Sequence, residues 1–353
     1  MRVIEFTAPG EPLRVADRQT PLAGTCEVVV TVAYCGICGS DVHATEASAS
    51  QVGRGTVLGH EFSGIVEQSG DAAWKPGDRV IGIPLHPCDE CRPLGVCKDG
   101  LGIVCPKNRI VGMSPEVPGG YAERVKIGAR QLLAVPDGVP LDVAALAEPL
   151  AVGAHAVRYA GQLLGCRVLV IGAGPIGLAT AAFAARAGAR DVVVSEIDPI
   201  RRERALRLGA TAVVDPASGP VAERFRSIAG GSPEVVFECV GVPGVLAQAV
   251  ELAAIRGRVV VVGVCRHEDR IMPRVALRKE LSLQFVLGYT DQDFRLSLDL
   301  LKSPGFDAGA LITRRVSFDE LPAVFESLRG PNPEAKVLLE PARRNDITTI
   351  TGS

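Results

Sequence analysis

The sequence predicts an α/β protein with two domains, a β-rich domain followed by a doubly wound parallel sheet. Residues 1 to about 150 contain short β segments broken by Gly and Pro, with no long helical period. From residue 163 to residue 289, apolar strands alternate with helical stretches, which is typical of a parallel sheet. With 353 residues, 47% of them hydrophobic and 22% charged, the chain can form two domains with sizeable cores.

In the first region we expect strands at residues 27–33, 64–68 and 79–83. A thiol, an imidazole and a carboxylate flank the first two segments, at Cys38, His60 and Glu61. These donors suit zinc, and a mixed set of three leaves room for water or substrate, unlike a closed structural site. A single Cys is more often a small buried hydrophobe. Glycines at positions 36, 39 and 59 favour the metal interpretation, because they let the backbone approach an ion closely.

Four further cysteines fall within eighteen positions, on a loop that contains Gly and Pro. Their number and soft donor character predict a closed structural zinc site. The alternative is a loop of free thiols that has lost its metal. Because the amino terminus lacks the apolar core of a signal peptide, we expect a cytoplasmic protein with reduced thiols. The four residues are Cys88, Cys91, Cys97 and Cys105.

In the second region six strands are predicted, and six match a doubly wound dinucleotide-binding fold. The first ends in a G-x-G-x-x-G turn, in which small residues let a pyrophosphate lie against backbone N–H groups. This motif is specific here because a helix, expected at residues 175–187, follows the strand and turn. The strands are expected at 167–172, 191–197, 212–215, 235–240, 258–264 and 282–288, and the turn comprises Gly172, Gly174, Pro175, Ile176 and Gly177.

Residues 168–185 carry no charge, and this run is long enough to suggest a membrane span. Three glycines and a proline break it into a strand, a turn and a helix, so we expect a buried βα unit and no membrane partner. The net charge of −2 likewise gives no reason to expect nucleic acid or an anionic membrane.

At the end of the second strand, Glu196 follows Gly177 by nineteen positions, near the spacing of the acid that binds the adenosine ribose. A carboxylate there accepts from a 2′-hydroxyl and repels a 2′-phosphate, which favours NAD over NADP. Three arginines follow, at positions 201, 202 and 204, and these could reach a phosphate. The alternative is a solvated helix face; we expect Arg201 to cover the adenine.

Seven motifs in the chain resemble those of the zinc-dependent medium-chain alcohol dehydrogenases, in the polyol branch of sorbitol, butanediol and threonine dehydrogenases. The resemblance covers nearly the whole chain. In family order the motifs are G-I-C-G-S-D-x-H, G-H-E-F-S-G, W-K-P-G-D-R-V, the four cysteines, G-G-Y-A-E, A-E-P-L-A-V-G and G-A-G-P-I-G. In relatives the middle gap of the four cysteines is usually two residues, whereas here it is five.

The resemblance implies that Cys38, His60 and Glu61 bind a catalytic zinc. It places Glu148 where relatives have a further ligand, or a partner to the water on the zinc. It also implies a GroES-like catalytic domain, formed by residues 1–153 and 290–353, and a Rossmann domain at residues 154–289. Relatives form homodimers or homotetramers through the edge strand of the nucleotide-binding sheet.

The activity implied is hydride transfer between a secondary alcohol or polyol and NAD, with zinc making the hydroxyl acidic. Ser40 would accept the proton and pass it, through cofactor hydroxyls, to His43, because an imidazole suits a proton relay. The alternative for His43 is a surface imidazole. The loop at residues 44–57 is rich in Ala, Ser and Gly, which hints at a small hydroxylated substrate such as a polyol. Competing hypotheses are a zinc-free reductase of enones or quinones, and a non-catalytic nucleotide-binding protein.

Overall fold

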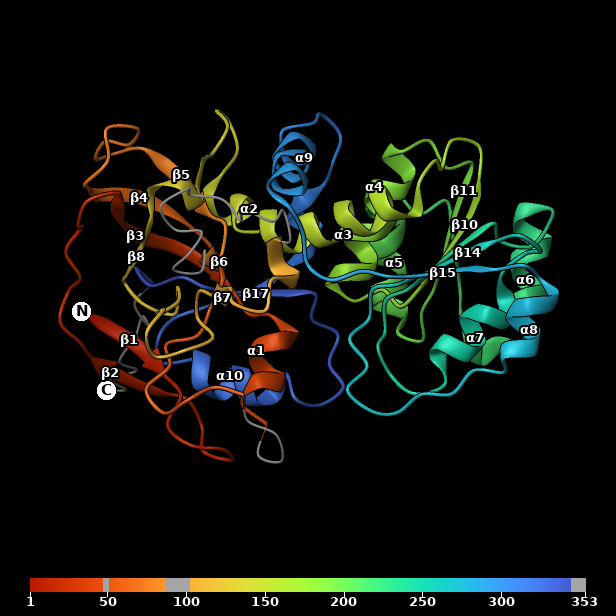
Figure 1. The fold of residues 1–353 in the computed structure, drawn as a ribbon, viewed down its shortest axis with the longest axis horizontal. Coiled ribbons are helices and arrows are strands. Elements are labelled where there is room, and N and C mark those ends of the chain that lie inside the picture. The colour runs from red at the N-terminus through yellow and green to blue at the C-terminus, as the bar shows by residue number, and fades with distance from the viewer. Residues whose placement is uncertain (47–50, 87–101, 344–353) are drawn as a thin grey trace, which may run out of the picture. The chain divides into compact units, whose positions relative to one another are not determined.

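The computed structural model describes residues 1–46, 51–86 and 102–343, and it divides into two compact units. Unit 1 combines Met1–Leu146 with the segment from Ile312 onward, and unit 2 is Ala147–Leu311. In Figure 1 the amino-terminal strands of unit 1 are red to yellow and its carboxyl-terminal strands are blue, while the strands of unit 2 run from green to light blue. Among the described residues, no helix is long and apolar enough to cross a membrane.

Unit 1 is built on a seven-stranded sheet whose central strand is β3 (Glu27–Gly36). This strand pairs antiparallel with β4 (Glu61–Ser69), β8 (Arg124–Gly128) and β17 (Lys336–Leu339), and β5 (Arg79–Gly82) pairs with β4. The carboxyl end of β3 thus lies between β4 and β17, which are far apart in the sequence. The remaining strands are β9 (Leu132–Ala134) and β16 (Ile312–Val316) in the sheet, and the two pairs β1 (Arg2–Glu5) with β2 (Arg14–Asp17) and β6 (Leu85–His86) with β7 (Arg109–Ile110).

The core of unit 1 lies where β3 and β4 meet the buried side chains of the later segments. Phe62, Tyr121, Phe318 and Phe325 are all fully or almost fully buried there, among the valines of β3. Alternating apolar residues in β3 place one face of the strand on this core. The helices of the unit are short: α1 (Gly39–Ala44), α2 (Leu141–Ala144) and α10 (Leu321–Ser327).

Unit 2 contains a six-stranded parallel sheet in the order β12-β11-β10-β13-β14-β15. Each predicted strand is present, and the order reverses after the first strand of the unit, as in a dinucleotide-binding fold. The predicted fold class is therefore confirmed. The strands are β10 (Arg167–Ile171), β11 (Asp191–Ser195), β12 (Ala212–Val214), β13 (Val235–Glu238), β14 (Arg258–Val261) and β15 (Ser282–Phe285).

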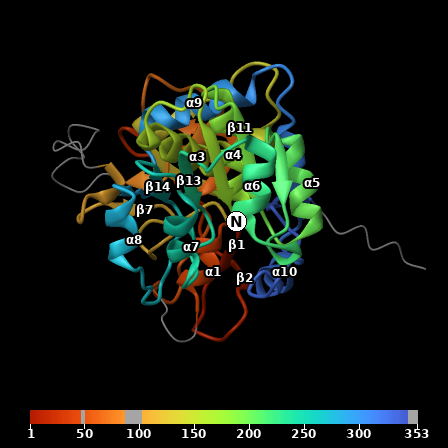
Figure 2. The same ribbon diagram turned by 90° about the vertical axis from the view of Figure 1, so that its right-hand side faces the viewer.

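Helices cover both faces of this sheet (Figures 1 and 2). On one face, α6 (Val221–Ala229) and α7 (Val245–Leu252) pack on a core that includes Leu169, Val193 and Val236. On the other face, α4 (Pro175–Arg186) lies against β10 and β11, with α3 (Ala147–Ala160) alongside it. The remaining helices are α5 (Pro199–Arg207), α8 (Pro273–Arg278) and α9 (Asp291–Leu301).

The limits of unit 2 differ from the predicted domain limits of 154 and 289, because α3 and α9 both pack into this unit. A side chain at Gly153 would place its Cβ 2.6 Å from the backbone of Ala179, so α3 and α4 approach closely at this glycine. Helices α3 and α9 are joined through Asp293, which accepts from His155 Nδ1 at 2.8 Å and from the Arg158 guanidinium at 2.7 Å. The sequence pattern alone does not reveal these helix contacts.

We predict that Asp293 makes unit 2 sensitive to acid. Burial alone would raise the pKa of this carboxyl, but hydrogen bonds from His155, Arg158 and Thr290 outweigh burial and lower the pKa to about 2. The unfolded value is about 3.9, so the stabilisation is complete above that pH and is lost as the pH falls toward 2. Asp293→Asn should lower the free energy of unfolding by about 2 kcal/mol at pH 7, measured by urea denaturation.

The control is Asp307→Asn, which removes an exposed pair with Arg207 in the same unit. It should change the unfolding free energy by less than about 1 kcal/mol. Equal effects of the two substitutions at pH 7 would contradict the role given to Asp293.

Candidate functional site

Three potential metal ligands converge at the end of β3. Atoms of Cys38, His60 and Glu61 all lie within 4.8 Å of one another, and within the described residues this is the only group of three or more such side chains. Cys38 is the N-cap of α1, directly after β3, and Glu61 is the first residue of β4. The antiparallel pairing sets Gly36 opposite Glu61, so the sheet register brings these segments together.

The carboxylate of Glu61 is fully buried, and its two oxygens have different surroundings. Its Oε1 accepts from Lys336 Nζ at 2.7 Å, and this ammonium also donates to the carbonyl of Ile37 at 3.1 Å. Among the described residues, Glu61 Oε2 has no hydrogen-bond donor although it is buried. A bare buried carboxylate oxygen is unfavourable. A divalent cation shared with a thiolate and an imidazole would satisfy it, and these are zinc donors.

Asp41, on the first turn of α1, orients two of these ligands from behind. Its Oδ1 lies 3.2 Å from His60 Nδ1, and its Oδ2 accepts from the backbone N–H of Cys38 at 3.1 Å. Burial would lower the pKa of His60, but the Asp41 carboxylate raises it well above the ordinary value. A carboxylate on Nδ1 leaves Nε2 for a metal, a common arrangement around ligating histidines.

Gly36 and Gly59 were predicted to let the backbone approach an ion, but in the structure they make room for neighbouring side chains. A Cβ at Gly36 would lie 2.0 Å from Glu61 Oε2, and a Cβ at Gly59 would lie 2.4 Å from the ring of Tyr121. Gly59 also has a φ of +92°, which favours glycine. These positions make room for buried side chains around the cluster. A Cβ at Gly39 would meet nothing within 4 Å.

The two predicted relay residues lie on α1. Ser40 Oγ is 3.5 Å from His60 Nε2, which places the hydroxyl beside the cluster. His43 is exposed one turn later, and its Nδ1 is 2.5 Å from Glu46 Oε1. The far end of α1 is fixed by Arg329, which donates to the carbonyl of Val42 at 2.9 Å.

The Gly-rich turn after β10 has the predicted backbone form. Gly172 has a φ of +95°, and a Cβ at Gly177 would lie 2.0 Å from the carbonyl oxygen of Gly172, so helix α4 starts tightly against the turn. Gly174 is the N-cap of α4, and Pro175 is its first residue. A Cβ at Gly174 would meet nothing within 4 Å, which leaves the helix N-terminus accessible to a phosphate.

Glu196 follows β11 and is almost fully buried. Its Oε2 accepts from the N–H of Ala173 at 2.7 Å, and its Oε1 accepts from the N–H of Asp198 at 2.9 Å. The carboxylate therefore joins the Gly-rich turn to the start of α5, a connection that the spacing did not predict. Arg202 is used structurally, since it donates to the carbonyl of Glu196 at 2.7 Å.

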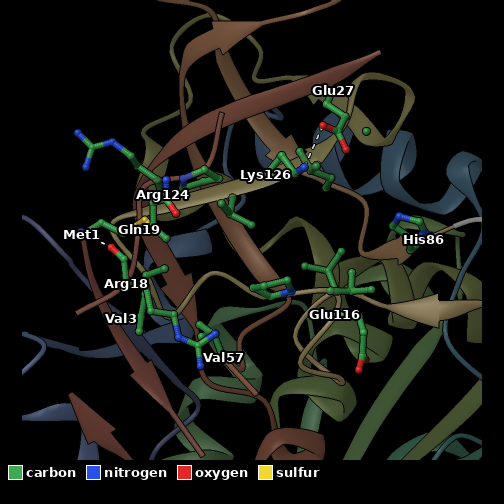
Figure 3. Close-up of a pocket in the computed structure, with 18 of the residues that line it drawn as sticks. Met1, Val3, Arg18, Gln19, Glu27, Val57, His86, Glu116, Arg124 and Lys126 are labelled. Carbon is green, nitrogen blue, oxygen red and sulfur yellow. Dashed lines mark hydrogen bonds and ion pairs between the residues drawn. The ribbon is translucent and has the colours of Figure 1, made fainter. Parts of the chain in front are cut away.

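One cavity lies in unit 2 and another in unit 1. One of about 300 Å³ lies at the carboxyl ends of β13, β14 and β15, where open parallel sheets bind ligands; Gly263, Val264 and Phe285 are among its lining residues. The other, of about 560 Å³ in unit 1, includes none of the three cluster residues (Figure 3). Its Lys126 is paired with Glu27 at 3.0 Å, and within the part of the chain that the structure describes its lining holds no group of three potential metal ligands.

Family models match both parts of the chain. The alcohol dehydrogenase GroES-like domain matches residues 24–137, and the zinc-binding dehydrogenase model matches residues 175–303. The (R,R)-butanediol dehydrogenase of Bacillus subtilis (strain 168) is 31% identical, over 93% of this chain and 96% of that protein. The chain belongs to the zinc-dependent medium-chain alcohol dehydrogenase family. The predicted resemblance is thereby confirmed.

Other relatives also match over nearly the whole chain. L-threonine 3-dehydrogenase of Sinorhizobium fredii is 30% identical, over 96% of this chain and 98% of that protein. The crystal structure of 2R,3R-butanediol dehydrogenase from Bacillus subtilis has a TM-score of 0.85 at 29% identity, covering 96% and 99% of the two chains. A zinc-binding dehydrogenase from Sinorhizobium meliloti 1021, bound to NADP, has a TM-score of 0.85 at 32% identity, covering 96% and 99%.

The other predicted site residues of this dehydrogenase are Glu148, Arg201 and the four cysteines. Glu148 is buried in the first turn of α3, in unit 2. Arg201 is half-buried in α5, and its backbone N–H donates to Asp198. Cys105 is partly exposed, and the other three cysteines of the predicted structural site, Cys88, Cys91 and Cys97, lie outside the described residues.

We predict that Lys336→Met strongly destabilises the metal-free dehydrogenase. The substitution leaves the Glu61 carboxylate buried without its ammonium partner, and breaking a buried pair in this way costs about 3–5 kcal/mol. The matched control is Lys126→Met, whose exposed pair with Glu27 contributes less than about 1 kcal/mol. Unfolding of chelator-treated protein measures both. A loss at Lys336 no larger than at Lys126 would show that the buried pair is not needed.

Proposed function

We propose that this chain is an NAD-dependent dehydrogenase of a secondary alcohol or polyol, with a catalytic zinc bound by Cys38, His60 and Glu61. The observation that supports this most directly is their convergence within 4.8 Å, with one buried carboxylate oxygen of Glu61 lacking a donor among the described residues. Glu148 is proposed as a further ligand. When bound, zinc would lower the pKa of a substrate hydroxyl and so assist hydride transfer to the nicotinamide.

The chain's own residues would then orient the reactants and move the proton. Asp41 Oδ1 lies at ion-pair distance from His60 Nδ1 and would hold the imidazole with Nε2 toward the metal, and Lys336 Nζ donates to Glu61 Oε1. Ser40 lies beside the cluster and would accept the proton from the substrate hydroxyl. His43, further along α1 and exposed, would receive that proton and release it to solvent.

The cofactor site is proposed in unit 2. The open N-terminus of α4 at Gly174 would bind the pyrophosphate, and the Glu196 carboxylate would accept from the adenosine ribose hydroxyls while repelling a 2′-phosphate. One structural relative is bound to NADP and another, from Escherichia coli, is complexed with NADH, so the preference for NAD rests on Glu196.

The proposal is tested by zinc analysis of the purified protein and by NADH absorbance with a panel of polyols, diols, sugars and amino alcohols. We expect bound zinc, turnover of one of these classes, and a kcat/KM with NAD that exceeds the value with NADP by about 100-fold, or about 2.7 kcal/mol. Turnover without any zinc would favour a zinc-free reductase. Bound zinc without turnover across the panel would favour a non-catalytic nucleotide-binding protein.

A second prediction concerns the relay. His43→Asn should lower kcat/KM for alcohol oxidation by about 10²-fold or more, because general acid–base groups typically contribute 10²–10⁴-fold. Zinc content should not change. The matched control is His86→Asn, a histidine of β6 outside the cluster, which should keep full activity. If His43→Asn and His86→Asn have the same kcat/KM, the relay does not pass through His43.

We also propose that the protein is a homodimer or homotetramer that assembles through β15. This strand is at the edge of the sheet of unit 2, and Phe285 and Leu287 near its end are 62% and 52% exposed. An exposed apolar edge strand is a pairing site for another chain. Phe285→Asp should therefore reduce the mass in light scattering, whereas Leu164→Asp, at another exposed apolar residue, should not. An unchanged mass for Phe285→Asp would contradict assembly through this edge.

A further inference from the structure

The hydroxyl of Tyr121 is part of the buried polar chain behind the proposed metal ligands. Tyr121 is 0% exposed, and its OH donates to Asp41 Oδ2 at 2.7 Å. The other oxygen of Asp41 lies 3.2 Å from His60 Nδ1. A continuous path thus runs from the phenol, through one carboxylate, to the imidazole.

We propose that Tyr121 is a positioning residue for the metal centre, acting through Asp41 on His60. The inference rests on the proposed zinc site, and it assigns to Tyr121 a role in metal affinity. With the phenol bound to Oδ2, the carboxylate is restrained, and its Oδ1 stays directed at His60 Nδ1. The imidazole then presents Nε2 to the ion without rotating, and outer partners of this kind commonly affect metal affinity.

Backbone contacts attach Tyr121 to the segment that carries His60. The N–H of Tyr121 donates to the carbonyl of Leu58 at 2.9 Å, and the N–H of Gly120 donates to the carbonyl of Gly59 at 2.7 Å. The ring lies against Gly59, where a Cβ would be only 2.4 Å away. The phenol therefore has a fixed place relative to His60, because the two are joined by both the backbone and Asp41.

The hydroxyl can act only as a donor to Asp41 at working pH. Burial raises the pKa of the Tyr121 phenol well above its ordinary value, and the nearby Asp41 carboxylate raises it further. The Asp41 carboxylate is itself fully buried, and it needs such donors because an incompletely solvated charge is unfavourable there. Among the described residues, loss of the phenol would leave Asp41 with the N–H of Cys38 and the His60 imidazole as its remaining polar contacts.

The test is the zinc dissociation constant of Tyr121→Phe, measured by chelator competition on metal-depleted protein. We expect binding about tenfold weaker, at the lower end of the 10–100-fold seen when outer partners are removed. The matched control is Tyr34→Phe, which also removes a phenol–carboxylate bond, to Glu340 Oε1 at 3.1 Å, in the same unit. It should bind zinc like the unmodified protein. Cys38→Ser gives the baseline for any zinc held by the four-cysteine segment.

A double substitution distinguishes the path from general packing. In Asp41→Asn protein, adding Tyr121→Phe should have no further effect on zinc affinity if the phenol acts through the carboxylate. Unchanged affinity in Tyr121→Phe, an equal loss when it is added to Asp41→Asn, or failure of Tyr121→Phe to fold would each overturn the inference. If the unmodified protein binds no zinc beyond the Cys38→Ser baseline, the proposed function itself fails.

Discussion

The site depends on a buried carboxylate, Glu61, that is hydrogen-bonded through only one of its two oxygens among the described residues. Lys336 satisfies one oxygen of Glu61 at 2.7 Å, while the other oxygen is buried without a donor among the described residues. The desolvation penalty of such a group is several kcal/mol unless a charge or donor compensates it. The thiol of Cys38 and the imidazole of His60 are within reach of the same point. The fold thus places three potential donors of a divalent cation around one point.

The sheet of unit 1 supplies this place by register. β3 has β4 on one side and β17 on the other, and Gly36 is opposite both Glu61 and Leu338. Lys336 therefore reaches Glu61 across the end of β3, and the missing side chain of Gly36 provides the space. A one-residue slip would turn these side chains to the other face of the sheet. The positions of Glu61 and Lys336 therefore depend directly on the register of β3 with its two neighbours.

The sequence predicts the repetitive parts well, because local patterns determine them. The six strands of unit 2, the turn at Gly172 and the helix from Pro175 all follow from apolar periodicity and from residues with special backbone freedom. The ligand trio could be proposed because its donor chemistry is distinctive. Even the family could be inferred, since its motifs occur in order along the chain.

The residues that surround the three proposed ligands were not predicted. Asp41 lies inside the G-S-D motif, and its acidic character next to Cys38 was an available signal. Lys336 is 275 positions from Glu61, and no local pattern connects the two. The reason for Gly59 is the ring of Tyr121, from a segment far along the chain, and this again is a tertiary contact. Such partners depend on side-chain direction and strand order, which single-sequence patterns do not determine.

The most direct measurement is anomalous diffraction at the zinc absorption edge from crystals of the protein. If the three side chains hold zinc, a peak will lie about 2.3 Å from Cys38 Sγ and about 2.0–2.1 Å from a nitrogen of His60, the usual lengths of these bonds. Glu61 Oε2 will face the same peak. A zinc-soaked crystal with no peak between these side chains, or with Cys38 and His60 turned apart, would show that they do not share a zinc ion.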